Sequence, residues 1–289
     1  MSLQKYLVVF NPLAGKKGQR YLAKVRQALD HANTPYDIYH TKQDSAADEA
    51  NLKIQVNSYS DIISMGGDGT LNMLCNVLAH KDIPLGIIPC GTGNDFTRNI
   101  YDEEQDIISV VTGSRVKSID LGHCNDRYFI NILGIGYDAM MVRNTMYDSK
   151  GMFRSLFYLW NALKYLPFYK EESVHIKSAK LVKNDKTFIA AFGNGAFFGN
   201  GMKITPKADI TDGLLDCCWI GKLSFLQKCH CLWRSFKGEH LGQKNIDYTQ
   251  AEEFHVLSGK HLIEADGEFI GYTPATIRVA KKALVLKVL

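Results

Sequence analysis

The sequence predicts an α/β plus β protein: an N-terminal α/β nucleotide-binding domain built on a parallel sheet, then a C-terminal β-sandwich domain. In the first 115 residues, short apolar runs alternate with segments of helical periodicity. Such alternation is typical of parallel strands joined by helical crossovers. After residue 115, strand-like runs follow one another with few helices between them, which favours a sandwich. The length of 289 residues suits two domains of ordinary size.

The first domain, residues 1–115, is expected to alternate strands with helices. Runs rich in β-branched, aromatic and other apolar residues predict strands at 6–10, 36–40, 61–65 and 84–88. Helical segments are predicted at 19–32, 45–56 and from Leu71 to Leu78. Ligands of such sheets bind at the loops beyond the carboxyl ends of the strands, so the functional residues are expected there.

The second domain, residues 116–289, is expected to be rich in β-structure, and its last residues are compatible with a return to the first domain. The predicted strands are 116–124, 128–133, 174–182, 187–192, 214–220, 254–257, 261–265 and 275–288. Two helices are predicted, at 152–165 and 223–238. Phe153, Phe157 and Trp160 share one face of the first of these, which fits either a membrane surface or the sandwich core.

Composition and charge exclude several classes of protein. The 34 lysines and arginines exceed the 30 carboxylates only slightly, so the net charge of +4 does not indicate a nucleic-acid partner. The first ten residues lack the apolar run of a signal peptide, and no uncharged apolar stretch of about 18 residues occurs. The seven cysteines show no repeated paired spacing, so we expect reduced thiols in an intracellular protein.

Three glycine-rich segments follow predicted strands of the first domain. They span 11–18, 66–70 and 91–95, and none has the spacing of a common phosphate or dinucleotide loop. Glycines nonetheless let backbone N–H groups approach a polyphosphate near a helix N-terminus. Asp68 lies among three glycines, where it would repel phosphate unless a metal ion or a proton lay between them. Each segment alone could be a simple turn, but three at one sheet edge favour a phosphate site.

These segments resemble the diacylglycerol kinase catalytic-domain family, which includes bacterial lipid kinases and the sphingosine and ceramide kinases. The resemblance is carried by Asn11-Pro12-x-x-Gly15-Lys16, by Gly66-Gly67-Asp68-Gly69-Thr70 and by Pro89-Cys90-Gly91-Thr92-Gly93-Asn94-Asp95-Phe96. The carboxyl half carries matching pieces, at Asn194-Gly195, Pro206-x-Ala208, Asp212-Gly213-Leu214-Leu215-Asp216 and Asp266-Gly267-Glu268. The order and spacing of the pieces cover nearly the whole chain and imply an NAD-kinase-like fold.

The resemblance implies an ATP site in the first domain and a Mg²⁺ site in the second. The implied nucleotide-binding residues are Asn11, Gly15, Thr41, Gly66, Gly67, Asp68, Gly69, Thr70, Thr92, Asn94 and Asp95. The implied metal ligands are the carboxylate of Asp212 and the carbonyls of Asp209 and Leu214, and oxygen ligands suit a hard cation.

The resemblance further implies transfer of the γ-phosphoryl group of ATP to the hydroxyl of diacylglycerol or a similar lipid alcohol. Glu268 is the candidate general base, with Asp266 as its partner and the order of the two left open, and Asp68 would act with Mg²⁺ and ATP. Two positions depart from the family pattern: Ala14 replaces a frequent serine, and Met73 replaces a common acidic residue. Both put nucleotide contacts there in question.

Other functions compete with this interpretation. NAD kinases share the Gly-Gly-Asp-Gly-Thr block and the two-domain plan, and a catalytically silent lipid-binding module is a third hypothesis. A zinc site at Cys229-His230-Cys231 with His240 lacks a fourth spaced ligand, so packing is favoured for these residues, as it is for Cys90. A lipid kinase must reach its substrate at a bilayer. We therefore expect a cytoplasmic protein in peripheral contact with the inner face of the membrane, and the resemblance is compatible with a homodimer.

Overall fold

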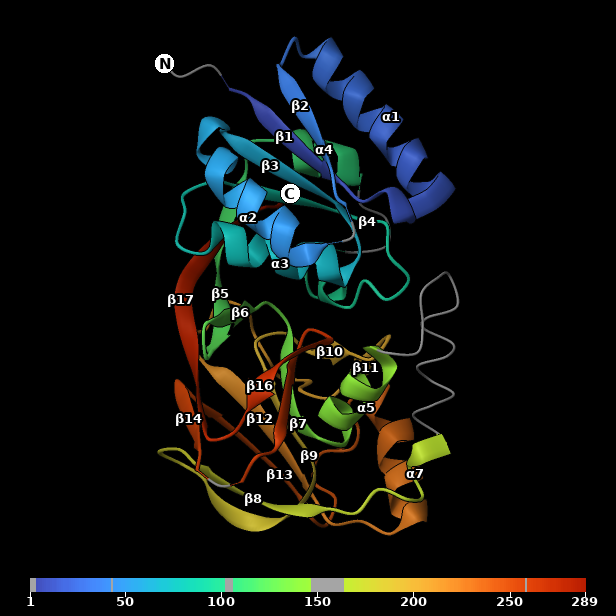
Figure 1. The fold of residues 1–289 in the computed structure, drawn as a ribbon, viewed down its shortest axis with the longest axis vertical. Helices are drawn as coiled ribbons and strands as arrows, with labels where there is room; N and C mark the ends of the chain where they lie inside the picture. The colour runs from blue at the N-terminus through green and yellow to red at the C-terminus, as the bar shows by residue number, and fades with distance from the viewer. Residues whose placement is uncertain (1–3, 43, 102–105, 147–163, 258) are drawn as a thin grey trace. The chain divides into compact units, whose positions relative to one another are not determined.

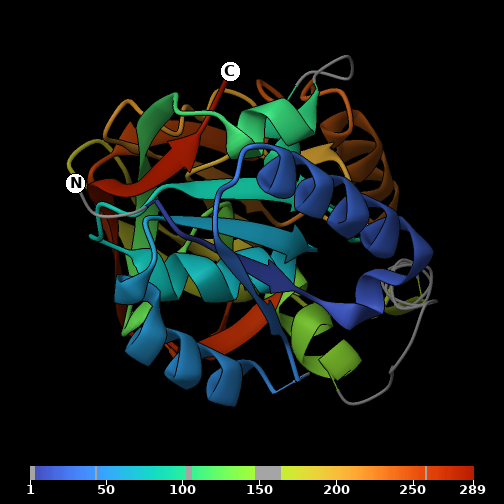
Figure 2. The same cartoon turned by 90° about the horizontal axis from the view of Figure 1, so that it is seen from above.

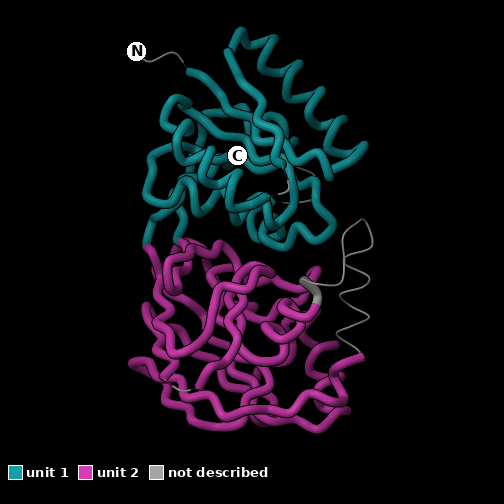
Figure 3. The backbone as a smooth tube through the Cα atoms, viewed as in Figure 1, with its two compact units in different colours: residues 1–120, 281–289 teal, residues 121–280 magenta. Residues whose placement is uncertain are grey.

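The computed structural model describes residues 4–42, 44–101, 106–146, 164–257 and 259–289. The chain forms two compact units, one of residues 1–120 and 281–289 and the other of residues 121–280 (Figure 3). The sequence analysis placed the border five residues earlier, after residue 115. The predicted helix at 152–165 lies almost entirely outside the described residues.

The first unit is built on four parallel strands in the order β2-β1-β3-β4 (Figure 1). Their bounds are Tyr6–Phe10 for β1, Tyr36–His40 for β2, Asp61–Gly66 for β3 and Leu85–Pro89 for β4. All five residues of β1 and all six of β3 are buried, as expected for strands covered on both faces. The end of β17 (Ala275–Lys287) pairs in parallel with the outer edge of β4 through Leu286 and Leu85.

Helices cover both faces of this sheet (Figure 2). On one face, α1 (Gly15–His31) and α4 (Ile107–Thr112) pack on a cluster that includes Phe10 and Val111. On the other face lie α2 (Ser45–Gln55) and α3 (Asp68–Leu78). Short 3-10 turns occur at Pro12–Ala14, Val56–Ser58 and Phe96–Asn99. The observed unit confirms the predicted parallel α/β domain.

The second unit is a β-sandwich centred on the long strand β9 (Val182–Gly193). One edge of β9 pairs with β12, and the other edge pairs with β8 and β7. The remaining pairs are β12 with β13, β14 with β8 and β17, and β15 with β7 and β16. The bounds are Arg127–Phe129 (β6), Ile132–Gly136 (β7), Glu172–Lys177 (β8), Leu215–Gly221 (β12), Ile246–Ala251 (β13), Glu253–Val256 (β14), Leu262–Ala265 (β15) and Glu268–Tyr272 (β16).

Two apolar clusters lie on opposite faces of β9. Phe192 packs inside the sandwich against Phe254, with ring centroids 5.2 Å apart. Phe188 and Ala191 belong to the outer cluster, which α5 (Tyr137–Met146) and α7 (Phe225–Ser235) cover. A separate two-stranded sheet joins β10 (Phe197–Phe198) to β11 (Met202–Lys203), and β5 (Val116–Cys124) pairs with β6 and β17.

Several predicted bounds in the first unit are wrong. The first helix begins at Gly15 rather than residue 19, because the side chain of Asn11 caps a 3-10 turn that leads directly into it. The helix predicted from Leu71 begins three residues earlier, at Asp68, two residues after Gly66 ends β3.

In the second unit, the predicted strand 128–133 is two strands, because residues 130–132 turn their amide groups to Asp266. The predicted strand 174–182 ends at Lys177, where Ser178 accepts a hydrogen bond from Leu181 N–H in a turn before β9. Among the described residues, six helices and strands were not predicted: α4, α5, β10, β11, β13 and β16.

Candidate functional site

The carboxyl ends of the four parallel strands bring the candidate nucleotide-binding residues to one edge of the first unit. Asn11 follows β1, Thr41 follows β2, Gly67 follows β3 and Gly91 lies just beyond β4. The Nδ2 of Asn11 donates to Oγ1 of Thr70 at 3.2 Å, which ties the first two glycine-rich segments together. The edge is the place where open parallel sheets bind ligands.

Two glycines in neighbouring loops approach each other closely. A Cβ added to Gly91 would lie 2.5 Å from the Cα of Gly67, and one added to Gly67 would lie 3.1 Å from the Cα of Gly91. The N–H of Cys90 donates to the carbonyl of Gly66 at 2.8 Å, which fixes this approach. The space between the two backbones therefore admits glycine at both positions and excludes a side chain at Gly91.

Asp68 begins α3 behind an N-cap residue, Gly67, that has no side chain with which to cap the helix. A Cβ on Gly93 would lie 2.9 Å from Oδ2 of Asp68 and 3.8 Å from Oδ2 of Asp95. Two carboxylates thus approach one glycine, Asp68 from α3 and Asp95 from the loop that carries the glycine, and Arg98 reaches Asp95 at 3.7 Å. A divalent cation brought in with a polyphosphate would relieve the repulsion between them, so these residues fit Mg·ATP.

Asn94 shapes its loop through its own side chain. Its Oδ1 accepts from the N–H of Gly91 at 2.9 Å, its Nδ2 donates to the Gly91 carbonyl at 2.8 Å, and its φ is +51°. Such local side-chain bonds are typical of asparagine in turns. Both polar atoms of Asn94 are therefore engaged in the loop, while the neighbouring Thr92 is exposed.

The remaining candidates of the first unit differ in accessibility. Gly15 is exposed, has a φ of +59° and has no atom within 4 Å of an added Cβ. Met73, which stands where the family commonly has an acidic residue, is a buried residue of α3. Cys90 is also buried, and burial raises the pKa of its thiol, so the predicted role as a core filler fits.

The candidate metal ligands of the second unit lie on a turn before β12. The Oδ1 of Asp212 accepts from Leu214 N–H at 2.9 Å, and Gly213 between them has a φ of +74°. Asp209 accepts from both the N–H and the hydroxyl of Thr211. One carboxylate with neighbouring carbonyl oxygens is a donor set suited to Mg²⁺, although the described residues hold no group of three or more acidic, His or Cys ligands.

Asp216 supports this turn. It is the last residue of the motif 212–216 and was not among the predicted metal ligands. It is fully buried and accepts hydrogen bonds from Tyr248 OH at 2.5 Å and Gln250 Nε2 at 3.1 Å. Burial raises the pKa of the Asp216 carboxyl, while these two bonds lower it. Gln250 also reaches Asp212 at 3.4 Å. A lone acid inside the apolar run 214–220 was the available signal.

The two candidate acids of the Asp-Gly-Glu motif have different surroundings. Asp266 lies in the tight turn between β15 and β16, with a φ of +49°. Its Oδ2 accepts from the N–H of Ile130 at 2.8 Å, and its Oδ1 accepts from the next two amides, each at 3.0 Å. Glu268 is half-buried at the start of β16, where Arg127 Nη2 lies 3.9 Å from its Oε2. Because Asp68 and Glu268 belong to different units, their convergence on one cleft stays a prediction.

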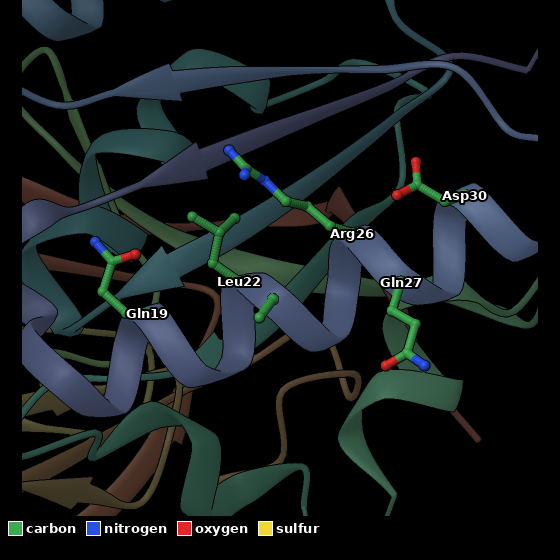
Figure 4. Close-up of a pocket in the computed structure, with 6 residues that line it drawn as sticks. Gln19, Leu22, Arg26, Gln27 and Asp30 are labelled. Carbon is green, nitrogen blue, oxygen red and sulfur yellow. The ribbon is translucent and has the colours of Figure 1, made fainter.

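Two further features fall outside these candidate residues. An open cavity of about 430 Å³ lies along α1, lined by Gln19, Leu22, Ala23, Arg26, Gln27 and Asp30 (Figure 4). In the other unit, Cys231 packs from α7 into the outer cluster, and His240 is buried with its Nε2 3.1 Å from the carbonyl of Ile204. These two positions support the packing interpretation.

Comparison with known proteins agrees with both halves of the chain. Residues 5–124 match the diacylglycerol kinase catalytic domain, and residues 131–288 match the YegS C-terminal NAD kinase β-sandwich-like domain. The diacylglycerol kinase of Bacillus subtilis is 29% identical over 94% of this chain and 92% of its own length. The diacylglycerol kinase of Staphylococcus haemolyticus is 26% identical over 95% of this chain and 85% of its own length.

Solved structures share the fold. A crystal structure from Bacillus anthracis aligns with a TM-score of 0.79, 24% identity and coverage of 100% of this chain and 99% of the other. A diacylglycerol kinase structure from the same organism aligns with a TM-score of 0.70 and 21% identity. The alignment covers 99% of this chain and 97% of the other. The structure of yeast NADH kinase complexed with NADH aligns with a TM-score of 0.52 and 10% identity. The alignment covers 99% of this chain and 84% of the other.

The fold and these matches define the class: a two-domain, NAD-kinase-like protein with a parallel α/β N-terminal region. The chain belongs to the diacylglycerol kinase catalytic-domain family, which implies kinase activity and the use of ATP. Among the described helices, none combines the length and apolarity that a membrane crossing requires.

Proposed function

We propose that this chain is an ATP- and Mg²⁺-dependent lipid kinase that phosphorylates the hydroxyl of diacylglycerol or a similar lipid alcohol. The observation that carries the proposal is the glycine-lined sheet edge where the carboxylates of Asp68 and Asp95 approach the same glycine. The family supports phosphoryl transfer, and relatives that bear the name diacylglycerol kinase align over more than nine-tenths of the chain.

In this proposal the first unit binds the nucleotide. Backbone N–H groups at the start of α3 and in the loop after β4 bind phosphate oxygens, favoured by the positive end of the helix dipole. Mg²⁺ neutralises charge on the phosphates when it is bound with ATP. Asp68, in the first turn of α3, orients that complex at the glycine-lined edge of the sheet.

Glu268 is the proposed base, and Asp266 is proposed to hold the turn that carries it. Both oxygens of Asp266 accept hydrogen bonds from backbone N–H groups, so this carboxylate is engaged in holding the turn. Arg127 Nη2 lies 3.9 Å from Glu268, and the half-buried position of Glu268 leaves it accessible to a hydroxyl. It would accept the proton of the lipid hydroxyl as the oxygen attacks the γ-phosphorus.

The Asp212 turn is a proposed structural Mg²⁺ site. The ion would hold the turn before β12 through the Asp212 carboxylate and the carbonyls of Asp209 and Leu214. Gln250, which contacts both Asp212 and the buried Asp216, would couple the metal turn to the sandwich.

Contact with the membrane is proposed for the exposed face of α7. Leu226 and Trp233, two helical turns apart, expose 76% and 64% of their surface, and Phe225 and Phe236 flank them at about half exposure. Exposed Lys222 and Lys237 lie at the two ends of this face. Bulky apolar side chains beside lysines favour the interface of an anionic bilayer.

Labelled ATP with mixed vesicles of diacylglycerol and phosphatidylglycerol tests the reaction. Label in an organic-phase product supports a lipid kinase, and a screen of lipid alcohols then names the substrate. Label in NADP, when NAD is offered instead, would support the NAD kinase alternative, which the NAD-kinase-like sandwich and the likeness to yeast NADH kinase keep open. Absence of transfer to either would support a silent lipid-binding module.

Vesicle sedimentation tests the membrane contact. Trp233→Gln should weaken binding to anionic vesicles about 10- to 100-fold, since burying a large aromatic side chain contributes about 1.5–3 kcal/mol. Val182→Gln is a matched control, because Val182 is 67% exposed on β9 and lies outside the proposed face. Equal binding by both variants would contradict a role for α7.

A further inference from the structure

Two acidic side chains of the second unit meet where a glycine leaves space between a strand and a helix. Gly134 on β7 lies directly opposite Glu264 on β15, and Asp138 lies in the first turn of the neighbouring helix α5. A Cβ on Gly134 would overlap Oδ2 of Asp138 and lie 2.7 Å from Oε1 of Glu264. The oxygens of the two carboxyl groups therefore crowd around the same point.

Both carboxyl groups are removed from solvent, and no cation among the described residues acts on them. Asp138 and Glu264 each expose only 4% of their surface. Oδ1 of Asp138 accepts from Ala139 N–H at 2.9 Å, whereas Oδ2, the oxygen near Glu264, has no hydrogen-bond donor in the described part of the chain. The ionisable groups that act on the pair are Asp266, which disfavours ionisation of Glu264, and Tyr169, which lies near Asp138.

The electrostatics of the pair oppose the doubly ionised form. Burial raises the pKa of both carboxyl groups, and the charge of Asp138 raises the pKa of Glu264 further. Two carboxylates this close, with no cation of the described residues acting on either, share one proton. A proton placed between Oδ2 and Oε1 would also give the otherwise unpartnered Oδ2 a hydrogen bond.

The other oxygen of Glu264 reaches the turn that carries the candidate base. Oε2 accepts from the N–H of Gly267 at 2.9 Å, and Gly267 separates Asp266 from Glu268. A displacement of the Glu264 carboxyl group would therefore move the backbone of Gly267, and with it the adjacent Glu268.

We propose that Asp138 and Glu264 share one proton, and that this protonated pair positions the Gly267 turn from which Glu268 projects. Asp138 and Glu264 are then positioning residues, and only the catalytic part of the inference rests on the proposed kinase function. Loss of the shared proton at alkaline pH would drive the two carboxylates apart and pull Glu264 away from Gly267.

The sign of the pH effect follows from the proton balance. The folded protein holds the shared proton at pH values where the unfolded chain has already released it. The contribution of the pair to stability is therefore largest below about pH 4, the unfolded carboxyl range, and falls as pH rises toward the raised pKa of the folded pair. Glu264→Gln replaces the protonated acid by an amide that can donate to Asp138 and still accept from Gly267.

The experiment compares wild type, Glu264→Gln, Glu264→Leu and Asp138→Asn by thermal unfolding from about pH 5 to about pH 9, a range that covers raised carboxyl titrations. The unfolding midpoint of the wild type should fall more steeply with pH than those of Glu264→Gln and Asp138→Asn. Parallel profiles for wild type and both amide variants would overturn the shared proton, whether or not the protein proves to be a kinase.

The catalytic arm uses kcat and KM on diacylglycerol vesicles, measured well below each unfolding midpoint. Glu264→Leu, which removes the acceptor for Gly267, should lower kcat about 10- to 100-fold with little change in the KM for ATP. Glu264→Gln should restore most of this loss and extend activity to higher pH than in the wild type. Equal kcat in the Leu and Gln variants would overturn the positioning role. Should no variant and no wild type transfer phosphate, the proposed function fails, and the stability profiles still decide the shared proton.

Discussion

Replacing Asp266 with asparagine separates the carboxylate that holds the β15–β16 turn from the candidate base two residues later. Asp266 accepts three hydrogen bonds from consecutive amides, of which Oδ1 takes two. An asparagine can keep the pair at one oxygen but sets its NH₂ group against the N–H of Ile130. It also loses the negative charge that strengthens all three bonds.

The expected loss is about 2–3 kcal/mol in the free energy of unfolding. One hydrogen bond to a charged group contributes about 1.5–3 kcal/mol, and the two remaining bonds weaken to neutral strength, partly offset because the turn is only half-buried. For a domain of this size the loss corresponds to a fall of roughly 5–10 °C in the unfolding midpoint. Glu268→Gln breaks none of these bonds, so its midpoint should stay within about 2 °C of the wild type.

Calorimetry and steady-state kinetics on the same samples decide between the two assignments. Glu268→Gln should lower kcat at least about 100-fold with little change in the KM for ATP, because a general base contributes that much or more. Asp266→Asn should retain much more activity when it is assayed well below its midpoint. The reasoning is refuted if Asp266→Asn keeps the wild-type midpoint and loses activity while Glu268→Gln stays active.

Other variants test other parts of the structure. Gly91→Ala should cost about 1–3 kcal/mol in unfolding free energy, because its Cβ would lie 2.5 Å from the Cα of Gly67. Gly69→Ala is the control: it lies on the first turn of α3 with no atom within 4 Å of an added Cβ, so it should be neutral or stabilising. Similar losses of unfolding free energy in both variants would contradict the close approach of Gly67 and Gly91. Asp212→Ala should abolish stabilisation by millimolar Mg²⁺ in thermal unfolding of the nucleotide-free protein; an unchanged Mg²⁺ response would remove the metal site from this turn. Lys287→Met should cost about 3–5 kcal/mol in unfolding free energy, measured by urea unfolding, because it leaves the buried Asp61 carboxylate without the ammonium group that now lies 2.6 Å away. A loss no larger than that for an exposed ion pair, about 1 kcal/mol or less, would contradict the buried ion pair.

The parallel sheet could be predicted closely because its strands are continuous apolar runs bounded by turn residues. The bounds of β1 and β2 agree with the prediction at both ends, and those of β3 and β4 agree within one residue. Elements with mixed composition were missed. The strand β13, Ile246–Ala251, alternates polar residues with few apolar ones, and its identity depends on pairing with β12 rather than on local propensity.

The contacts that shape the candidate site depend on long-range pairing, so the sequence alone could not reveal them. Glycine at position 67 indicates a turn, but only the register of β3 beside β4 brings it against Gly91. Similarly, Asp138 and Glu264 are 126 positions apart and have the appearance of ordinary polar residues. Their proximity depends on β15 pairing with β7, which a single sequence does not specify.

The polar residues of the candidate motifs divide their tasks in a consistent way. Asn94 closes the loop with both polar atoms of its side chain, and the next residue, Asp95, is thereby aimed at the same glycine as Asp68. Asp266 fills the same structural role for Glu268 through three backbone amides. Each motif thus contains one residue that builds the turn and one that the turn presents. Loss of activity on substitution cannot distinguish the two, because a collapsed turn also misplaces its neighbour. Paired measurements of stability and kcat can, since the turn-building residue changes both whereas the presented residue changes kcat alone.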